Sequence, residues 1–181
     1  MNNRKALNIT YNSVFIVLSI VLGFIGRISI FPVFPFLQLD FSDIPIFLSA
    51  AVSGISSGVT VWFVTSLLRA VMFSSSGWIG FVIRATSLII VIGFGICNKY
   101  KFKLRYKILF ISILGFVCLV TKLLANWYLW IEFFNLSPEF LNSLMFTIII
   151  PYNFLKIFLT SSIPILLEKP TNKLINTVAN Y

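Results

Sequence analysis

Long runs of apolar residues, with almost no polar stretch between them, constrain this chain more than any other feature. A helix needs about 20 apolar residues to cross a bilayer core roughly 30 Å thick. Hydrophobic residues make up 59% of the sequence and charged residues only 10%, against about 25% in a soluble domain. We therefore predict one integral membrane domain over residues 1–181, in the cell membrane, with the lipid bilayer as its solvent. The run from residue 7 to residue 30 is too long for a signal peptide and lacks a small-residue cleavage site, so we expect a transmembrane helix there.

The positions of the basic residues predict the topology. The formal net charge is +9, and in a membrane protein Lys and Arg gather in cytoplasmic loops, so the charge does not indicate a nucleic-acid partner. Arg4 and Lys5 make the N-terminus basic, and residues 99–107 form a second basic segment. If both lie in the cytoplasm, an even number of membrane crossings separates them.

Two crossings in that interval are the helices expected at residues 8–30 and 78–97. The apolar region between them, residues 44–73, would be about 45 Å long as one helix, which is too long for one crossing. Because Gly54 and Gly58 interrupt this region, we predict a hairpin of two short helices that are tilted or surrounded by protein. Helices at 106–131 and 144–168 complete an all-α bundle of six transmembrane helices, with both termini cytoplasmic.

The segment between the first two helices, residues 31–45, is rich in Phe and Pro. Ser42 or Asp43 is a suitable N-cap for the next helix, and Pro45 suits its first turn. Capping would explain at least one of the two acids, Asp40 and Asp43. The remainder is too hydrophobic for an ordinary solvent loop, so it either lies at the membrane interface or covers something.

Lys156 is the least expected residue, since a charge in the middle of a membrane helix costs at least about 2.5–3.5 kcal/mol and marks a candidate functional site. Pro151 should loosen the helix just before it. Asn153 is three residues from Lys156, so both share one helix face. The alternative is a lysine that snorkels or pairs with a backbone carbonyl.

Three other polar positions are also open to two interpretations. Asn126 either belongs to an aromatic belt with its Trp and Tyr neighbours or binds a ligand from the helix at 106–131. Lys122, one turn away, could pair across the bundle with an unidentified partner. Arg69 and Arg84 either snorkel to the outer interface or form a positive rim that attracts an anionic group.

Missing motifs exclude several function classes. The chain has no histidine, no Gly-rich phosphate loop, no GxSxG motif and no pair of carboxylates on one membrane helix face. Cys97 and Cys118 lie in apolar runs without CxxC spacing, so we expect both to be buried, reduced thiols. We expect no cofactor, no metal, no enzyme activity and no proton- or sodium-coupled transport, because a proton relay would require buried acids, which we expect this chain to lack.

Three local motifs resemble one transporter family. They are Pro35-Phe-Leu-Gln-Leu-Asp-Phe-Ser-Asp-Ile-Pro45, Gly54-Ile-Ser-Ser-Gly58 and Ile150-Pro-Tyr-Asn-Phe-Leu-Lys156. Together with six helices and a basic loop after the fourth, they are similar to the substrate-binding S components of energy-coupling factor (ECF) vitamin transporters, of the riboflavin/pantothenate-type group. The resemblance implies capture of a vitamin from outside, beneath the loop between the first two helices. It also implies a transmembrane scaffold (T) subunit and two cytoplasmic ATPase subunits as partners, and toppling of the S component to release the substrate.

The resemblance implies a substrate site as well. In riboflavin-type relatives the positions matching Asn126, Asn153 and Lys156 contact the polar edge of the flavin, and Phe36, Leu37, Asp40, Arg69 and Arg84 complete the expected binding set. Arg69 stands where riboflavin relatives commonly have Lys-Asn, which looks more like pantothenate-type or pyrimidine-type relatives. Residues 81–88 also lack the usual Ala-Asn. The first helix lacks an Ala-xxx-Ala strip, and its nearest small pair for packing on a scaffold is Ser19 and Gly23.

Three hypotheses follow. The first is a vitamin-binding S component, with riboflavin ahead of pantothenate or a pyrimidine precursor. Pantothenate is supported by the two arginines, because a carboxylate favours a cationic partner. The second is a small membrane enzyme or enzyme anchor, which would need acid and base residues clustered at one depth. The third is an accessory membrane subunit without a ligand, in which Lys156 could become Leu without loss.

Overall fold

The fold is described by a computed structural model that covers residues 2–26, 28–29, 38–72, 77–134 and 138–179. The elements in chain order are α1 (Asn2–Ile25), β1 (Ile28–Ser29), β2 (Gln38–Leu39), α2 (Asp43–Ser53), α3 (Ile55–Met72), α4 (Gly77–Ala85), α5 (Leu88–Lys99), α6 (Leu104–Phe134), α7 (Pro138–Leu144), the π-helical turn η1 (Met145–Ile149) and α8 (Ile150–Ala179).

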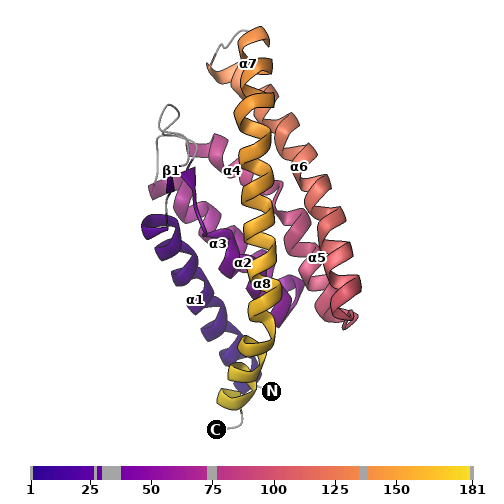
Figure 1. The fold of residues 1–181 in the computed structure, drawn as a ribbon. Helices are drawn as coiled ribbons and strands as arrows, with labels where there is room; N and C mark the ends of the chain where they lie inside the picture. Colours follow the sequence, from indigo (N-terminus) through magenta and orange to yellow (C-terminus); the bar gives the residue numbers. More distant parts are fainter. Residues whose placement is uncertain (1, 27, 30–37, 73–76, 135–137, 180–181) are drawn as a thin grey trace.

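These elements form the predicted bundle of six crossings (Figure 1). Two crossings consist of more than one element: α4 and α5 together make the fourth, and α7, η1 and α8 together make the sixth. Five crossings are long and apolar enough to span a membrane, and α2 is shorter. The Tyr11 hydroxyl donates to the Ile175 carbonyl at 3.4 Å, so the first part of α1 and the last part of α8 lie at the same end. α7 lies at the opposite end (Figure 1). The basic residues assign the shared end to the cytoplasm.

The short helix α2 lies at the centre of the bundle, where α1, α3, α5 and α8 surround it. All residues from Asp43 to Ala51 are buried, which confirms that this short helix is surrounded by protein. The predicted turn after it is also confirmed: Gly54 has φ +90°, a conformation that favours glycine. Gly58 lets α3 approach α2, since a Cβ there would lie 2.5 Å from the Ala50 Cβ. The Asn98 amide of α5 donates to the last α2 carbonyls, including Val52 O at 2.9 Å.

The first helix begins and ends earlier in the chain than predicted. α1 ends at Ile25 rather than continuing to residue 30, and Ile28 and Ser29 instead pair antiparallel with Leu39 and Gln38. The ladder satisfies backbone groups that a longer helix would otherwise bond internally. This hairpin brings the chain back to the start of α2, at the same level of the bundle as the end of α1.

The helix predicted at residues 78–97 is divided into α4 and α5. Between them the hydroxyls of Thr86 and Ser87 each donate to a carbonyl three residues earlier, at Ile83 and Arg84, both at 2.7 Å. Such side-chain bonds compete with the regular helix ladder. The Trp62 indole also donates to the Arg84 carbonyl, at 3.2 Å, and so fixes α3 against this junction.

The final crossing confirms that Pro151 loosens the helix before it. Proline has no N–H and its ring crowds the preceding turn, and here that turn is the π-helical η1, which ends at Ile149. The helix does not stop at Glu168 as predicted, because α8 continues to Ala179. Pro164 and Pro170 lie within it without ending it.

Candidate functional site

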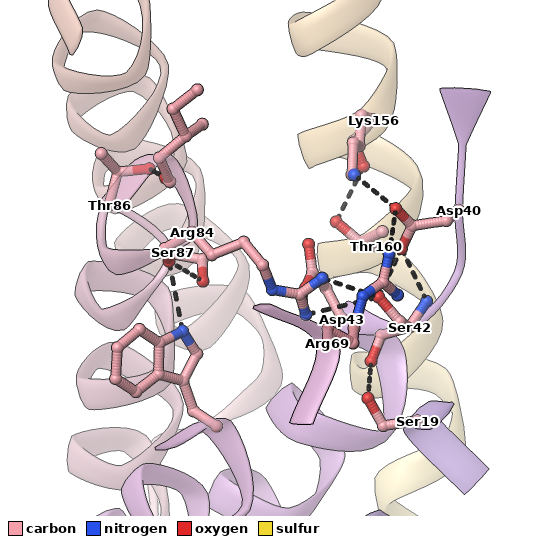
Figure 2. A network of polar contacts seen from close by, with 12 residues as sticks. Ser19, Asp40, Ser42, Asp43, Arg69, Arg84, Thr86, Ser87, Lys156 and Thr160 are labelled. Atoms are coloured by element: carbon pink, nitrogen blue, oxygen red, sulfur yellow. Dashed lines mark hydrogen bonds and ion pairs between the residues drawn. The ribbon is translucent and has the colours of Figure 1, made fainter. Parts of the chain in front are cut away.

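A buried network of charged side chains lies at the start of α2, and Asp40 is its centre. Asp40 follows β2 and is only 7% exposed. Its Oδ2 accepts from Lys156 Nζ of α8 at 3.2 Å and from Arg69 Nη2 of α3 at 3.4 Å (Figure 2). Its Oδ1 accepts from the Ser42 backbone N–H at 3.2 Å and from the Ser42 hydroxyl. One carboxylate therefore joins α3, α8 and the segment leading into α2.

The charges around Asp40 keep it ionised. Burial by itself would raise the pKa of this carboxyl group, which belongs to the segment between α1 and α2. Lys156, Arg69 and Arg84, with the Ser42 hydrogen bond, act in the opposite direction and hold the pKa well below its usual range. The expectation that the chain lacks buried acids is therefore wrong, since the two acids at the start of α2 are 7% and 5% exposed. Asp40 is nevertheless a fixed negative charge, unsuited to carrying a proton at neutral pH.

A second ion pair joins α4 to the first residue of α2. Arg84 Nη2 lies 2.9 Å from Asp43 Oδ1, and the same guanidinium group donates to the Ser42 hydroxyl at 3.3 Å (Figure 2). Ser42 is the residue before α2, as predicted, but its side chain makes no capping hydrogen bond to the helix. The local bond that Asp40 accepts from the Ser42 backbone N–H fits the predicted role at the helix start, but both carboxylates also form ion pairs that were not predicted.

The small residues Ser19 and Gly23 of α1 face this network. Ser19 is buried and donates to the Ser42 carbonyl at 2.6 Å. A Cβ at Gly23 would fall within the Arg69 guanidinium group, so this glycine makes room for the arginine. This pair, the nearest small pair that the first helix offers for packing on a scaffold, thus serves packing inside the bundle.

Asn126 and Lys122 lie on the inner face of α6. Each is 7% exposed, whereas their neighbours Trp127 and Tyr128 are 40% and 62% exposed. Asn126 therefore points away from the aromatic residues that face outward, which decides against its belonging to an aromatic belt. Within the part of the chain that the structure describes, the Asn126 amide makes no hydrogen bond.

The inner face of α8 carries Asn153 and Lys156. Asn153 is 3% exposed and its amide donates to the Ile149 carbonyl at 2.9 Å, at the point where the π-helical turn ends. Lys156 has a side chain 12% exposed and is paired with Asp40, so it neither snorkels nor relies on a backbone carbonyl. Because α6 packs against α8, both helices present polar residues to the interior of the bundle.

The structure thus places six of the eight predicted site residues in the bundle interior: Asp40, Arg69, Arg84, Asn126, Asn153 and Lys156. The snorkelling interpretation of Arg69 and Arg84 is wrong, because their side chains are 14% and 15% exposed and ion-paired. Phe36 and Leu37 lie outside the described residues.

Sequence reasoning missed Asp43 and Ser42 as members of the network and interpreted them as caps. The sequence feature that could have indicated their role is the pair of acids flanking a serine at the start of an apolar helix. The arrangement holds charged groups rigidly without a reactive one, since its carboxylates are paired and no three His, Cys, Asp or Glu side chains gather in the described ranges. Such a site can bind polar groups but offers no nucleophile with an adjacent base.

Comparisons with known proteins point in one direction. A family model described as "ECF transporter, substrate-specific component" matches residues 7–168. Among solved structures, one described as "Structure and mechanism of the S component of a bacterial ECF transporter" has a TM-score of 0.74, with 23% sequence identity over 97% of this chain and 99% of that chain. At this identity the likeness concerns the fold. The comparison with curated proteins gave no match.

Proposed function

The chain belongs to the family of substrate-specific components of ECF transporters, and from this premise we propose that it captures a vitamin-type molecule from outside the cell. The observation that carries the proposal is a rigid polar site buried among apolar helices, with donors from α6 and α8 facing inward. Charges inside a membrane protein are costly and usually functional. A lipid-facing or merely structural bundle would have no need of Asn126, which makes no hydrogen bond among the described residues.

In this proposal the binding residues are Asn126, Asn153 and Lys156, and the Asp40 network positions them. Asp40 holds Lys156 at 3.2 Å, which fixes the ammonium group in one place before a ligand arrives. A preformed donor set reduces the ordering cost of binding. The protein is a transport component rather than an enzyme, and its family implies a T component and ATPase partners. We assign it one such scaffold subunit and two ATPase subunits.

Riboflavin is the first candidate substrate, on the strength of the motifs around Asp40 and Lys156 and the two inward amides. The flat ring of a flavin carries carbonyl and imide groups along one edge, which amide side chains can hydrogen-bond. Pantothenate is the second candidate. It is favoured by a specific observation, namely that the buried network contains more cations than carboxylates.

The test is a titration of the purified full chain in detergent. Riboflavin binding is followed by quenching of its fluorescence, and pantothenate binding by calorimetry. Lys156→Leu should abolish or sharply weaken binding while the protein still inserts and elutes as a single species. Lys169→Leu is the matched control, since Lys169 is exposed near the inner end of α8. Unchanged vitamin affinity in Lys156→Leu would refute the assigned binding residues. Absence of both quenching of riboflavin fluorescence and a calorimetric signal from pantothenate would refute both candidate substrates.

A further inference from the structure

Lys122 belongs to a continuous inner stripe of α6 but has no role in the network described above. The buried residues of this helix recur every three or four positions, which is the period of one helix face. This stripe contains Lys107, Ile111, Gly115, Cys118, Lys122 and Asn126. Lys107 is matched by Glu168, at 2.5 Å. Lys122 lies well inside the bundle, and no packing argument requires an ammonium group there.

No other charged residue of the site lacks a counter-ion in this way. Arg69 and Lys156 share Asp40, and Arg84 pairs with Asp43. Lys122, by contrast, makes neither an ion pair nor a hydrogen bond to any residue in the described ranges. A buried charge without a partner is strongly destabilising, and evolution normally pairs it or removes it. The missing counter-ion is therefore an observation that points to a ligand.

One contact fixes the part of α6 that carries Lys122 beside the segment that follows Arg84. Cys118, one turn away on the same face, lies with its Sγ 3.4 Å from the Thr86 carbonyl, which fixes α6 against the junction that follows Arg84. The charged groups that act on Lys122 are Lys156, Asp43 and Arg84. Apart from the Lys107–Glu168 pair, the described interior thus holds four basic side chains against the two carboxylates of Asp40 and Asp43. The four are Lys122, Lys156, Arg69 and Arg84.

Buried hydrogen-bond donors without acceptors occur in this network and on the neighbouring turn of α3. Arg84 Nε is buried and has no acceptor among the described residues. The buried hydroxyl groups of Thr65 and Ser66, one turn before Arg69 on α3, also lack partners there. Buried donors are normally satisfied, so this excess favours a ligand group that supplies several acceptor oxygens.

We propose that Lys122, with Lys156 and Arg84, forms a subsite for an anionic group of the transported molecule, either a carboxylate or a phosphate. This inference rests on the proposed function and narrows its substrate class. It predicts that an anionic molecule, such as pantothenate or a flavin that carries a phosphate, binds more tightly than free riboflavin, and it thereby reverses the order of the two candidate substrates given above. A bound anion would neutralise the excess positive charge and accept hydrogen bonds that the interior leaves unmade.

The test compares matched pairs of ligands that differ in the anionic group. The pairs are pantothenate with its alcohol analogue pantothenol, and riboflavin 5′-phosphate with riboflavin, each titrated into the full chain in detergent. At least one anionic member should bind about tenfold or more tightly than its neutral partner. Lys122→Met should lower the affinity of that member by about 10- to 100-fold, the range for losing a charge-assisted hydrogen bond, and change the neutral member's affinity little.

A charge-conserving variant and a control complete the test. Lys122→Arg keeps the charge and should retain most of the preference for the anionic member. Lys103→Met is the control, at an exposed position before α6, and should leave all four affinities unchanged. Neutral members that bind as tightly as anionic ones would overturn the inference and leave the proposed function standing. Equal losses for both members of a pair in Lys122→Met would also overturn it. Absence of binding by all four compounds would overturn this inference together with both candidate substrates of the proposed function.

Discussion

Asp40→Asn is the substitution that tests the network most directly. It keeps the shape of the side chain and removes the one carboxylate that Lys156 and Arg69 share, at 3.2 and 3.4 Å. Breaking a buried ion pair by removing one partner costs about 3–5 kcal/mol, because the other charge stays buried and unpaired. In a domain of this size 1 kcal/mol shifts the melting temperature by about 2–4 °C, so we expect a decrease of roughly 6–20 °C.

The assay is thermal unfolding of the purified protein in detergent, followed by a dye that reports thiol exposure, since Cys97 and Cys118 are both buried. Glu139→Gln is the control, because Glu139 is exposed on α7 and surface changes usually stay within about 0.5 kcal/mol.

A double variant isolates the ion pair itself. Lys156→Met added to Asp40→Asn removes one of the two stranded cations and should recover part of the lost stability. The sum of the two single effects should then exceed the effect of the double variant, as expected for residues in contact. The reasoning would be refuted if Asp40→Asn melted within about 2 °C of the parent protein, or if the two effects were additive.

Two further predictions follow from the packing. Gly23→Ala should push the Arg69 guanidinium group away from the carboxylate that it pairs with and lower the melting temperature by several degrees, and an unchanged value would show that the arginine has room to move. Glu168→Gln should leave Lys107 buried without its counter-ion and lower the free energy of unfolding by about 3 kcal/mol, measured by thermal unfolding. The double variant Glu168→Gln, Lys107→Met should lose less stability, and a double variant no more stable than Glu168→Gln would contradict this.

Much of the candidate site could be predicted because a charge within an apolar run has few explanations. Lys156 and Asn153 stand out on composition alone, and the three-residue spacing places them on one face. The direction of that face cannot be deduced from α8 itself, since the sequence of one helix does not show which neighbouring helices it packs against. The same holds for Asn126, whose interior position was decided by the packing of α6 against α5 and α8 and not by its aromatic neighbours.

The ion-pair partners of the charged residues could not be predicted from the sequence. Asp40 lies 116 residues from Lys156 and 29 from Arg69, and nothing local indicates that the three meet. Asp43 was equally well explained as a helix cap, because capping is a local interaction and the competing ion pair with Arg84 is not. Helix ends were misplaced for the same reason: the strand pairing of Ile28 with Leu39 replaced the last turn expected of α1.

The sequence by itself determined that this is a membrane protein of six crossings, because the length of an apolar run and the placement of basic residues act locally against a bilayer of fixed thickness. It also determined which polar residues require an explanation. Only the tertiary structure decided that α2 is enclosed by four helices, that Arg69 and Arg84 turn inward to two carboxylates, and that Lys122 lacks a counter-ion among the described residues. Those outcomes depend on contacts between distant segments, which no single helix encodes.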